Sequence, residues 1–467
     1  MKKIKIGFLP LYIKLYDDTG NGAAARPVMM DFYLGIAKQF EQMGFDVVTS
    51  EFCRIEPEFR ETVEKFEREG ADCIVTWHAA YSPSLESIKV LSETKLPIVV
   101  LDTTDTYDFS PSQDPSNISR CHGIHGVMDM CSMLRRYGKK FAIAAGHYAE
   151  SDVVDRVAGF VRAAYAAKSL DGSRTASIGG SFDGMGDFLV SDEQMKARFG
   201  VEIVYPSKDE IKAELDAVTD ADAEAEMIID KESCYEILPI DKAVHMRTAK
   251  NSLAVRRWLD KNNIDAFTAN FREVTYEGSG LEIMPFMEAC KSMARGIGYA
   301  GEGDVLTASL VGALMKGFTD KAAFVEIFCP DWKGNTLLLS HMGEYNPKLI
   351  RCKAGMKEIN FIFGDSENPI VSYGCYRGGP AVFVNLYQVA EGFRLLISPV
   401  EMQDVAVEED NFEGRVRGWM KPHIPVAEFL ESISRAGATH HSALIYDATP
   451  EQLAFFAQLC GLGYEIV

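Results

Sequence analysis

The chain has 467 residues, of which 47% are hydrophobic and only 18 are prolines. A chain of this length and composition can bury several hydrophobic cores, so we expect two or three domains. Its 48 basic and 68 acidic residues give a formal net charge of -20, which repels a phosphate backbone and excludes nucleic acid as an expected partner.

The N-terminal segment and the apolar runs indicate the cellular compartment of the protein. The first residues include lysines, but Lys14, Asp17 and Asp18 interrupt the apolar stretch before it reaches the length of a signal peptide. Because no uninterrupted apolar run is long enough to span a bilayer, we expect a cytoplasmic protein with no membrane partner. The ten cysteines include no CxxC pair, which predicts neither a zinc cluster nor a disulfide framework.

The first third of the chain alternates short β-branched runs with longer segments of helical periodicity, a pattern typical of a doubly wound parallel sheet. The strand candidates are KIKIGFLPL from Lys3, DVVTSEF from Asp46, CIVTWH from Cys73, PIVVLD from Pro97 and FAIAAGH from Phe141. Residues 27–43 and 83–93 predict helices, and Ser82 before Pro83 predicts an N-cap. The pattern therefore predicts a flavodoxin-like α/β domain over residues 1–169.

Ligands of such a sheet bind beyond the carboxyl ends of its strands, where ordinary loop polar groups also occur. Trp77, His78, residues 102–105 and His147 fall at these ends. HGIHG from His122 carries two imidazoles three residues apart, but no carboxylate of an HExxH motif accompanies them. We therefore interpret HGIHG as a loop-to-helix junction at this edge of the sheet.

The remainder of the chain changes character near Thr319. Residues 170–318 predict a second α/β domain, with a strand at AFTANF from Ala266 and a helix over 305–316. Beyond them, runs separated by Gly, Pro and Asn are typical of antiparallel strands. These runs are NTLLLSH, LIRCKAG, INFIFG, IVSYGCY, AVFVNLY and FRLLISPV. We expect residues 319–467 to form a β-rich domain, closed as a small barrel or a sandwich.

Two glutamates and two histidines stand out in the second half of the chain. Glu302 lies between glycines in GYAGEGD, and Glu326 lies in the apolar run AAFVEIFCP, where a buried carboxylate requires a partner. His341 ends a strand candidate, and His441 follows His440 between a helical segment and a strand. Two carboxylates and two imidazoles suit Mn, Co or Mg, although spacing alone does not distinguish this set from a chance scatter.

GYAGEG also shares glycines with the loops that bind dinucleotides. It departs from GxGxxG, and no strand is expected to lead directly into it. A dinucleotide site is therefore not expected.

The segment GYAGEGDVLTASLVGALMK resembles the GEGDWKTA segment of the L-arabinose isomerase family, which carries a metal-binding glutamate. Further segments are similar to the family in the same order along the chain: TWHAAYSPS, HGVMDMCSMLRR, GHYAESDVVDRVAGFVRAA, AFTANF, FVEIF, LLLSHMGEYNP and GATHHS. The resemblance implies a metal-dependent aldose–ketose isomerase of carbohydrate metabolism that acts on a monosaccharide through an enediol. It also implies a homo-oligomer, a hexamer in the family.

The family's site residues transfer one by one to positions of matching type. The resemblance assigns the metal ligands to Glu302, Glu326, His341 and His441, and the lining of the sugar pocket to Met185, Phe271 and His440. It implies Mn2+, or another divalent cation such as Co2+ or Mg2+, as the cofactor. The two glutamates are assigned jointly as catalytic acid and base.

The sequence departs from the family at positions that bear on the sugar. Leu9 in GFLPLYI stands where the family's GSQHLYG has a glutamine that approaches the sugar, and Ile327 stands where the family has aspartate. Because hydrogen bonds built into a site discriminate between sugars, the substrate stays open among L-arabinose, another pentose and a hexose such as L-fucose or D-galactose. Two other functions stay open: a non-catalytic sugar-binding or regulatory protein on the same fold, and another metal-assisted reaction on a polyol or sugar acid.

Overall fold

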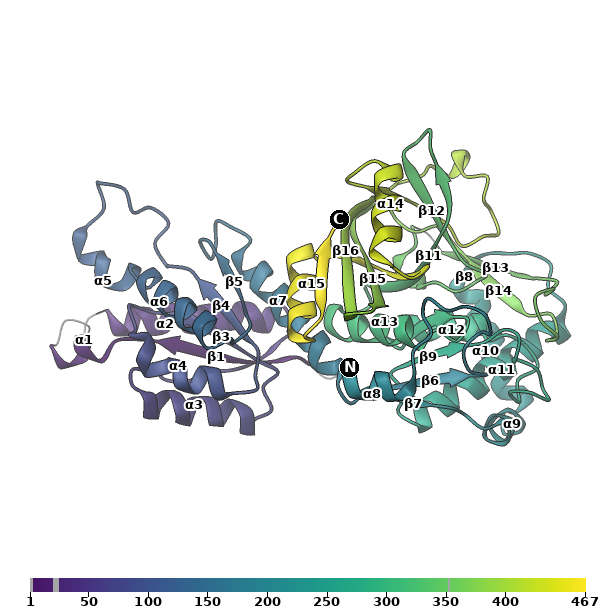
Figure 1. Ribbon diagram of the computed structural model, residues 1–467, viewed down its shortest axis with the longest axis horizontal. Coiled ribbons are helices and arrows are strands. Elements are labelled where there is room, and N and C mark those ends of the chain that lie inside the picture. The colour runs from purple at the N-terminus through teal and green to yellow at the C-terminus, as the bar shows by residue number, and fades with distance from the viewer. Residues whose placement is uncertain (1–2, 20–24, 352) are drawn as a thin grey trace. The chain divides into compact units, whose positions relative to one another are not determined.

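The computed structural model describes residues 3–19, 25–351 and 353–467 (Figure 1). The chain forms two compact units, Met1–Lys168 and Ser169–Val467. Within the second unit we propose residues 170–318 and 319–467 as separate domains. Among the described helices, none has both the length and the apolar character needed to cross a membrane.

The first unit is built on a parallel five-stranded sheet. Its strands are β1 (Lys5–Leu11), β2 (Asp46–Val48), β3 (Cys73–His78), β4 (Ile98–Asp102) and β5 (Phe141–Ala145). Their order across the sheet is β2-β1-β3-β4-β5, which is the flavodoxin-like arrangement of a doubly wound fold. The five predicted strands and the predicted fold of this region are confirmed.

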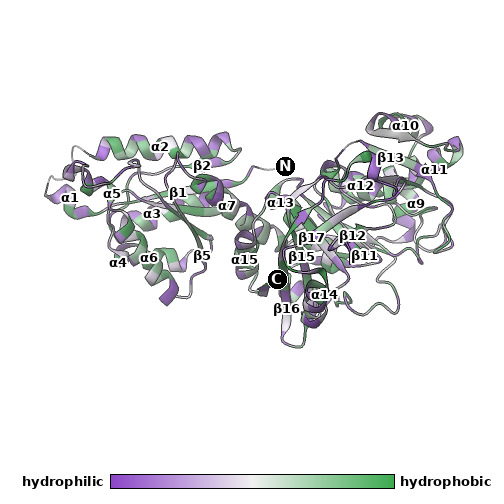
Figure 2. Cartoon of the chain, turned by 90° about the horizontal axis from the view of Figure 1, so that it is seen from above, coloured by the Kyte–Doolittle hydropathy of each residue, from purple (hydrophilic) through white to green (hydrophobic). Residues whose placement is uncertain are grey.

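Helices cover both faces of this sheet. Successive side chains of a strand point to opposite faces, and along β1, β3 and β4 nearly all of them are buried. On one face, Tyr33 of α2 (Arg26–Gln42) stacks on Phe8 with ring centroids 4.5 Å apart. On the other face lie α3 (Glu56–Arg68), α4 (Ser84–Glu93) and α6 (Ile124–Arg136), which bury their apolar sides against Leu9 and its neighbours (Figure 2). The remaining helices are α1 (Lys14–Asp18), α5 (Ile118–Cys121) and α7 (Val153–Leu170).

The start of α4 differs from the prediction that Ser82 caps it. Pro83 occupies the N-cap position and makes no side-chain hydrogen bond. Asp129 of α6 instead accepts hydrogen bonds from the main-chain N–H and the hydroxyl of Ser84, at 3.0 and 2.8 Å. A carboxylate from a neighbouring helix thus satisfies a free N–H group of the first turn, which local sequence cannot reveal. The prediction for HGIHG is confirmed, since His122 and Gly123 connect α5 to α6.

The second unit begins with a parallel four-stranded sheet of order β10-β9-β6-β7. Its strands are β6 (Arg174–Ile178), β7 (Glu202–Val204), β9 (Ala266–Ala269) and β10 (Gly298–Gly301). Its helices are α8 (Asp192–Phe199), α9 (Lys208–Asp216), α10 (Asp220–Ser233), α11 (Lys242–Lys261), α12 (Phe286–Ala294) and α13 (Val305–Phe318).

Strand β10 forms the first four residues of GYAGEG and leads directly into Glu302, while residues 295–297 before the motif form no strand, as predicted. The strand packs against α13 backbone to backbone, because a Cβ on Gly298 would lie 2.3 Å from the main-chain nitrogen of Gly312. Asp304 caps α13 and is fully buried. A carboxylate therefore already occupies the helix N-terminus that a dinucleotide phosphate would need.

A buried cluster of charges joins α10, α11 and α12. Arg256 of α11 pairs with Glu226 of α10 at 2.6 Å and with Glu288 of α12 at 2.8 Å. Lys291 also pairs with Glu226, at 2.5 Å, and Arg295 pairs with Glu288 at 2.8 Å. Burial alone would raise the pKa of Glu226, but the hydrogen bonds of Arg256 and the charge of Lys291 lower it to about 2.

The lowered pKa of Glu226 predicts a pH window for stability. Its pKa in the folded protein, about 2, lies below the ordinary value of 4.5, so the ionised form stabilises the fold fully above about pH 4.5 and this contribution is lost as the pH falls toward 2. We expect Glu226→Gln to lose less unfolding free energy than the wild type when the pH falls from about 6 to about 3, measured by urea unfolding. Glu224→Gln, on an exposed face of the same helix, is the control; a Glu226→Gln slope equal to that of the wild type would contradict the prediction.

The last part of the second unit is a closed six-stranded antiparallel barrel, which confirms the predicted barrel-like region. Its strands run in the order β15-β18-β11-β12-β17-β16, and pairing of β15 with β16 closes the ring. They are β11 (Ala322–Asp331), β12 (Thr336–Ser340), β15 (Gly379–Val389), β16 (Gly392–Met402), β17 (Gly418–Pro422) and β18 (His441–Tyr446). β19 (Gly463–Ile466) adds to β16 in parallel, and the helices of this part are α14 (Val426–Ala436) and α15 (Pro450–Leu459).

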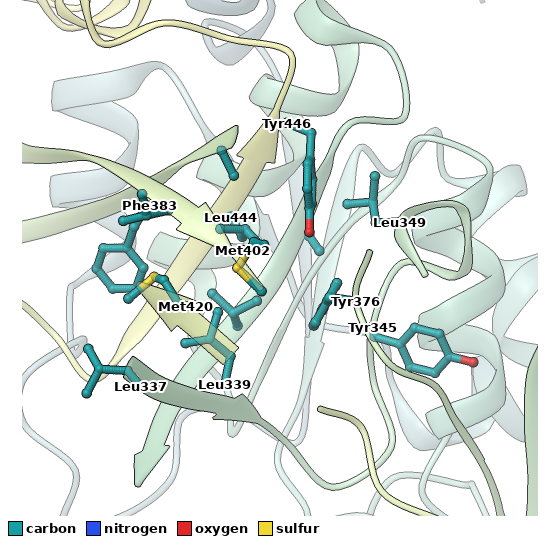
Figure 3. Close-up of a cluster of buried hydrophobic side chains, with 14 of the residues drawn as sticks. Leu337, Leu339, Tyr345, Leu349, Tyr376, Phe383, Met402, Met420, Leu444 and Tyr446 are labelled. Carbon is teal, nitrogen blue, oxygen red and sulfur yellow. The ribbon is translucent and has the colours of Figure 1, made fainter. Parts of the chain in front are cut away.

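The barrel strands contribute alternate residues to an apolar core, as period-two side-chain alternation requires (Figure 3). Leu337 and Leu339 of β12 belong to it, two residues apart on one face of the strand. Members from other strands include Phe383, Met402, Met420, Leu444 and Tyr446.

Two strand predictions between residues 349 and 364 are wrong or shifted. LIRCKAG supplies only its last two residues to β13 (Ala354–Glu358), which pairs with β8 (Cys234–Ile237) and β14 (Ile370–Tyr373) in a separate sheet. INFIFG forms no strand. The N–H of Phe361 donates to the side chain of Asn368 at 3.0 Å, and Ile362 is 72% exposed. A side-chain acceptor thus replaces the neighbouring strand that the apolar run was expected to have.

Candidate active site

Glu302 lies in the turn between β10 and α13. Its φ of 65° is in the left-handed region that residues other than glycine rarely adopt. The turn is held by close packing: a Cβ on Gly303 would lie 2.2 Å from the carbonyl oxygen of Gly180, and the N–H of Gly303 donates to Thr268 Oγ1 at 2.9 Å. The backbone at Glu302 is therefore fixed by contacts on two sides, which sustain its unusual conformation.

Glu326 and His441 belong to neighbouring strands of the barrel, and His341 stands directly after the end of a third strand. Glu326 of β11 lies directly opposite His441 of β18 on one side and Ser340 of β12 on the other, and His341 follows Ser340. Residues directly opposite each other in an antiparallel pair project from the same face, so the register brings Glu326 and His441 together. A register shift between Ile327 and Cys329 follows at once, and such bulges commonly stand next to active sites.

The four predicted metal ligands converge. Nε2 of His341 lies 3.6 Å from Oε2 of Glu326, and Nε2 of His441 lies 3.5 Å from Oε2 of Glu302. Glu326, His341 and His441 each offer a ligand atom within 4.8 Å of the others, and Glu302, His440 and His441 form a second such group. His441 belongs to both groups and so joins them into one site.

Two atoms of this site show that its residues fit a divalent metal ion. His441 Nε2 and Glu302 Oε2 are both buried, and neither has a hydrogen-bond partner. A buried polar atom without a partner is costly, whereas a cation between an imidazole nitrogen and a carboxylate oxygen would satisfy both. Nitrogen and oxygen donors of this kind suit Mn2+, Co2+ and related ions.

A carboxylate holds the other ring nitrogen of each histidine. The pairs are His341 Nδ1 with Glu344 at 2.7 Å, His441 Nδ1 with Asp304 at 3.0 Å and His440 Nδ1 with Asp187 at 2.7 Å. Because an ionised carboxylate only accepts, each Nδ1 donates, and Nε2 is left to face the site.

Sequence analysis missed these three carboxylates. Asp304 stands two residues after Glu302 and Glu344 stands three residues after His341, so nearness in sequence to a ligand was the signal available for both. No local signal marks Asp187, which is 253 positions from His440.

Burial and neighbouring charges shift the pKa values of the site in opposite directions. Burial alone would lower the pKa of His341, but the charge and hydrogen bond of Glu344 raise it to about 9. Burial likewise opposes the rise of the His440 pKa to about 10, which the hydrogen bond to Asp187 and the nearby carboxylate of Glu302 cause. The pKa of Glu302 is lowered despite burial by its three histidine neighbours, whereas burial raises the pKa of Glu326. The two carboxyls thus stand in electrostatically different surroundings.

Aromatic rings enclose the histidines, and the sequence analysis missed them too. Phe324 meets His341 and His441 edge-on, with ring centroids 4.8 and 4.9 Å away. Phe188 stacks on His441 at 5.1 Å with an interplanar angle of 4°. Phe324 precedes Glu326 by two residues, so strand alternation was a usable signal for its place on the same face. These rings therefore pack directly against the imidazoles.

The predicted sugar-pocket residues lie around Phe182. The N–H of Phe182 donates to the carbonyl of Glu302 at 3.0 Å, and the Phe182 ring lies 5.1 Å from the ring of Phe271. The N–H of Met185 donates to the carbonyl of Phe182 at 3.4 Å. Nε2 of His440 lies 3.5 Å from Glu302 Oε2. The structure therefore brings Phe271 and Met185 to the segment next to Glu302, and His440 to Glu302 itself.

Leu9 does not lie where the sequence comparison expected it. Its side chain is fully buried in the apolar cluster of the first unit, with Phe59 and Ile74. A leucine is suited to that place because the helices cover this face of the sheet. Leu9 therefore contributes to the core rather than to a sugar-facing surface.

Comparisons with known proteins identify the family to which the chain belongs. Residues 186–320 match the L-arabinose isomerase central domain, and residues 321–463 match the L-arabinose isomerase C-terminal domain. The chain is 27% identical over 417 residues to the L-arabinose isomerase of Herpetosiphon aurantiacus, covering 84% of this chain and 79% of that protein. The enzymes of Aeromonas salmonicida and Halalkalibacterium halodurans are 24% and 26% identical, over 84% of this chain and 80% of each relative. The chain belongs to the L-arabinose isomerase family and is a sugar isomerase.

Proposed function

We propose that the protein is a divalent-metal-dependent aldose–ketose isomerase of a pentose or hexose. The proposed metal ligands are Glu302, Glu326, His341 and His441. The observation that carries the proposal is the pair of buried, unpartnered ligand atoms, His441 Nε2 and Glu302 Oε2, inside a converging set of carboxylates and imidazoles. Family membership supports a monosaccharide as the substrate.

The proposed chemistry moves two protons. Converting an aldose into a ketose shifts one proton between C1 and C2 and another between their oxygens, through an enediol with charge on adjacent oxygens. When bound, a divalent cation supplies Lewis acidity that stabilises this charge. Glu302 and Glu326 are assigned jointly as the acid and base that remove and return the carbon-bound proton.

Three further residues are proposed to bind and orient the sugar. The side chain of His440 is 37% exposed, and Asp187 holds both its main-chain N–H and its Nδ1. This anchoring fixes the ring beside Glu302, where it can bond a sugar hydroxyl. Phe271 and Met185 are proposed to form the apolar wall, since both lie around the Phe182 segment that contacts Glu302.

We propose Mn2+ as the ion, with Co2+ or Mg2+ as alternatives, because the donor set mixes two imidazole nitrogens with two carboxylate oxygens. By its resemblance to the family, we also propose that the protein is a homo-oligomer.

Metal removal tests the proposed function directly. We expect protein stripped with a chelator to have no activity on a panel of pentoses and hexoses, and reloading with Mn2+ to restore ketose formation from at least one of them. The product should have the same mass as the substrate. His441→Asn is expected to abolish Mn2+ binding, whereas His423→Asn, at an exposed histidine outside the site, is the matched control.

Other outcomes would assign the protein differently. Sugar binding that is insensitive to chelator, without turnover of any sugar, would indicate a non-catalytic sugar-binding protein. A product of changed mass would indicate another reaction on the same fold.

A further inference from the structure

The two carboxylates behind the proposed histidine ligands have different second partners. Oδ2 of Asp304 accepts from His441 Nδ1 at 3.0 Å, while its Oδ1 accepts from the main-chain N–H of Thr307 at 2.8 Å. That second hydrogen bond caps α13. Asp304 and His441 are both fully buried, so no water competes with either hydrogen bond.

Glu344 distributes its hydrogen bonds differently between its two oxygens. Its Oε2 accepts from both His341 Nδ1, at 2.7 Å, and the main-chain N–H of Gly343, at 2.9 Å. Its Oε1 accepts from the hydroxyl of Tyr299 at 3.1 Å. The main-chain donor and the imidazole therefore share one oxygen of Glu344, whereas they bind different oxygens of Asp304.

We propose that Asp304 is a positioning residue that keeps the proton of the His441 ring on Nδ1. The hydrogen bond by which Asp304 caps α13 fixes which of its side-chain atoms faces His441. The inference rests on the proposed function, in which Nε2 of His441 must be free of a proton to bind the metal ion. A main-chain N–H is always a donor, so whichever atom of residue 304 faces Thr307 must be an acceptor. The cap thereby dictates which atom of residue 304 meets the imidazole.

The arrangement predicts opposite results for two amide substitutions of similar shape. In Asp304→Asn, the amide oxygen must face Thr307, so the NH2 group faces His441 and requires Nδ1 to accept. The ring proton then moves to Nε2, which blocks the ligand atom.

In Glu344→Gln, the amide oxygen faces Gly343 and still accepts from His341 Nδ1. The NH2 group faces the hydroxyl of Tyr299, which can accept a hydrogen bond. Nδ1 of His341 therefore keeps its proton and its acceptor, as in the wild type. Only the negative charge behind that ring is lost.

Two measurements test the proposal. Nitrogen-15 NMR of histidine-labelled, metal-free protein should show His441 protonated at Nδ1 in the wild type and in Glu344→Gln, and at Nε2 in Asp304→Asn. Titration with Mn2+ should show affinity reduced about 10- to 100-fold or more in Asp304→Asn, and less than about tenfold in Glu344→Gln. Nδ1 protonation of His441 in Asp304→Asn, or equal Mn2+ affinities of the two variants, would overturn the proposal.

Controls separate positioning from folding and from the proposed function. Asp241→Asn makes the same change at the cap of α11, where the carboxylate accepts from main-chain N–H groups, and it should leave Mn2+ affinity unchanged. Asn is itself a good N-cap, so thermal unfolding of Asp304→Asn should stay close to that of the wild type. Asp304→Ser keeps a cap but gives His441 no carboxylate, and its Mn2+ affinity should lie between those of the wild type and Asp304→Asn. If the wild type binds no Mn2+ while the proton still moves as predicted, the proposed metal function fails and the positioning role stands.

Discussion

Glu302→Gln and Glu326→Gln are each expected to lower kcat by about 10²- to 10⁴-fold, with a smaller change in KM. Each amide keeps the shape of the carboxylate but can neither accept the carbon-bound proton nor serve as an anionic metal ligand. Steady-state kinetics with Mn2+ present, on the aldose that gives turnover, is the measurement. Binding of Mn2+ should weaken in both variants, because each loses one of the two proposed carboxylate ligands.

The matched control is Glu277→Gln, on the surface of the same unit, where the carboxylate is 81% exposed and pairs with Lys208. It should keep wild-type kcat and KM. Turnover within about tenfold of the wild type in either site variant would contradict the joint acid–base assignment. A large loss in only one variant would assign the carbon-bound proton to that glutamate.

Arg256→Met is expected to lower the free energy of unfolding by about 3–5 kcal/mol. Arg256 bonds Glu226 and Glu288, whose side chains are 5% and 0% exposed. Methionine fills a similar volume, but it leaves these buried carboxylates with fewer cations. An uncompensated buried charge destabilises the fold by more free energy than the intact ion pair contributes. Urea unfolding of the two proteins near neutral pH measures the difference.

The next residue supplies the control for this substitution. Arg257 pairs with Asp222 at 3.0 Å, but these side chains are 36% and 42% exposed. Such a pair is screened by solvent, so Arg257→Met should cost only about 0–1 kcal/mol. Equal losses of unfolding free energy in the two variants would show that burial does not determine how much this cluster stabilises the fold.

The overall fold could be predicted where hydrophobic periodicity is strong. Five β-branched runs of the first unit form five parallel strands, and three of the runs named after Thr319 form β12, β15 and β16 of the barrel. The failures occur where distant side chains satisfy the backbone. Asn368 takes the N–H of Phe361, and Asp129 caps α4 in place of Ser82, contacts that no local pattern encodes.

The candidate site was predicted through its resemblance to a family, since two glutamates and two histidines have no diagnostic spacing. Their convergence depends on barrel register, which places Glu326 opposite His441 although 115 positions separate them in the sequence (441 − 326). Asp187 could not be identified from the sequence because 253 positions separate it from His440, whereas Asp304 and Glu344 stand within three residues of a proposed ligand. Metal binding by the two glutamates and two histidines, and catalysis by the glutamates, remain predictions.

The closed barrel constrains how the amino-acid sequence of this protein can evolve. Glu326 and His441 face each other across adjoining strands of a ring without free edges, so sliding one strand by a single residue would break pairings all around it. The placing of Glu326 opposite His441 is therefore set by the strands and is independent of the length of the loops that join them. Insertions and deletions in the loop between β16 and β17, for example, can accumulate while Glu326 and His441 stay in place. Such a scaffold allows the surroundings of the proposed metal site to diversify while Glu326 and His441 stay opposite each other.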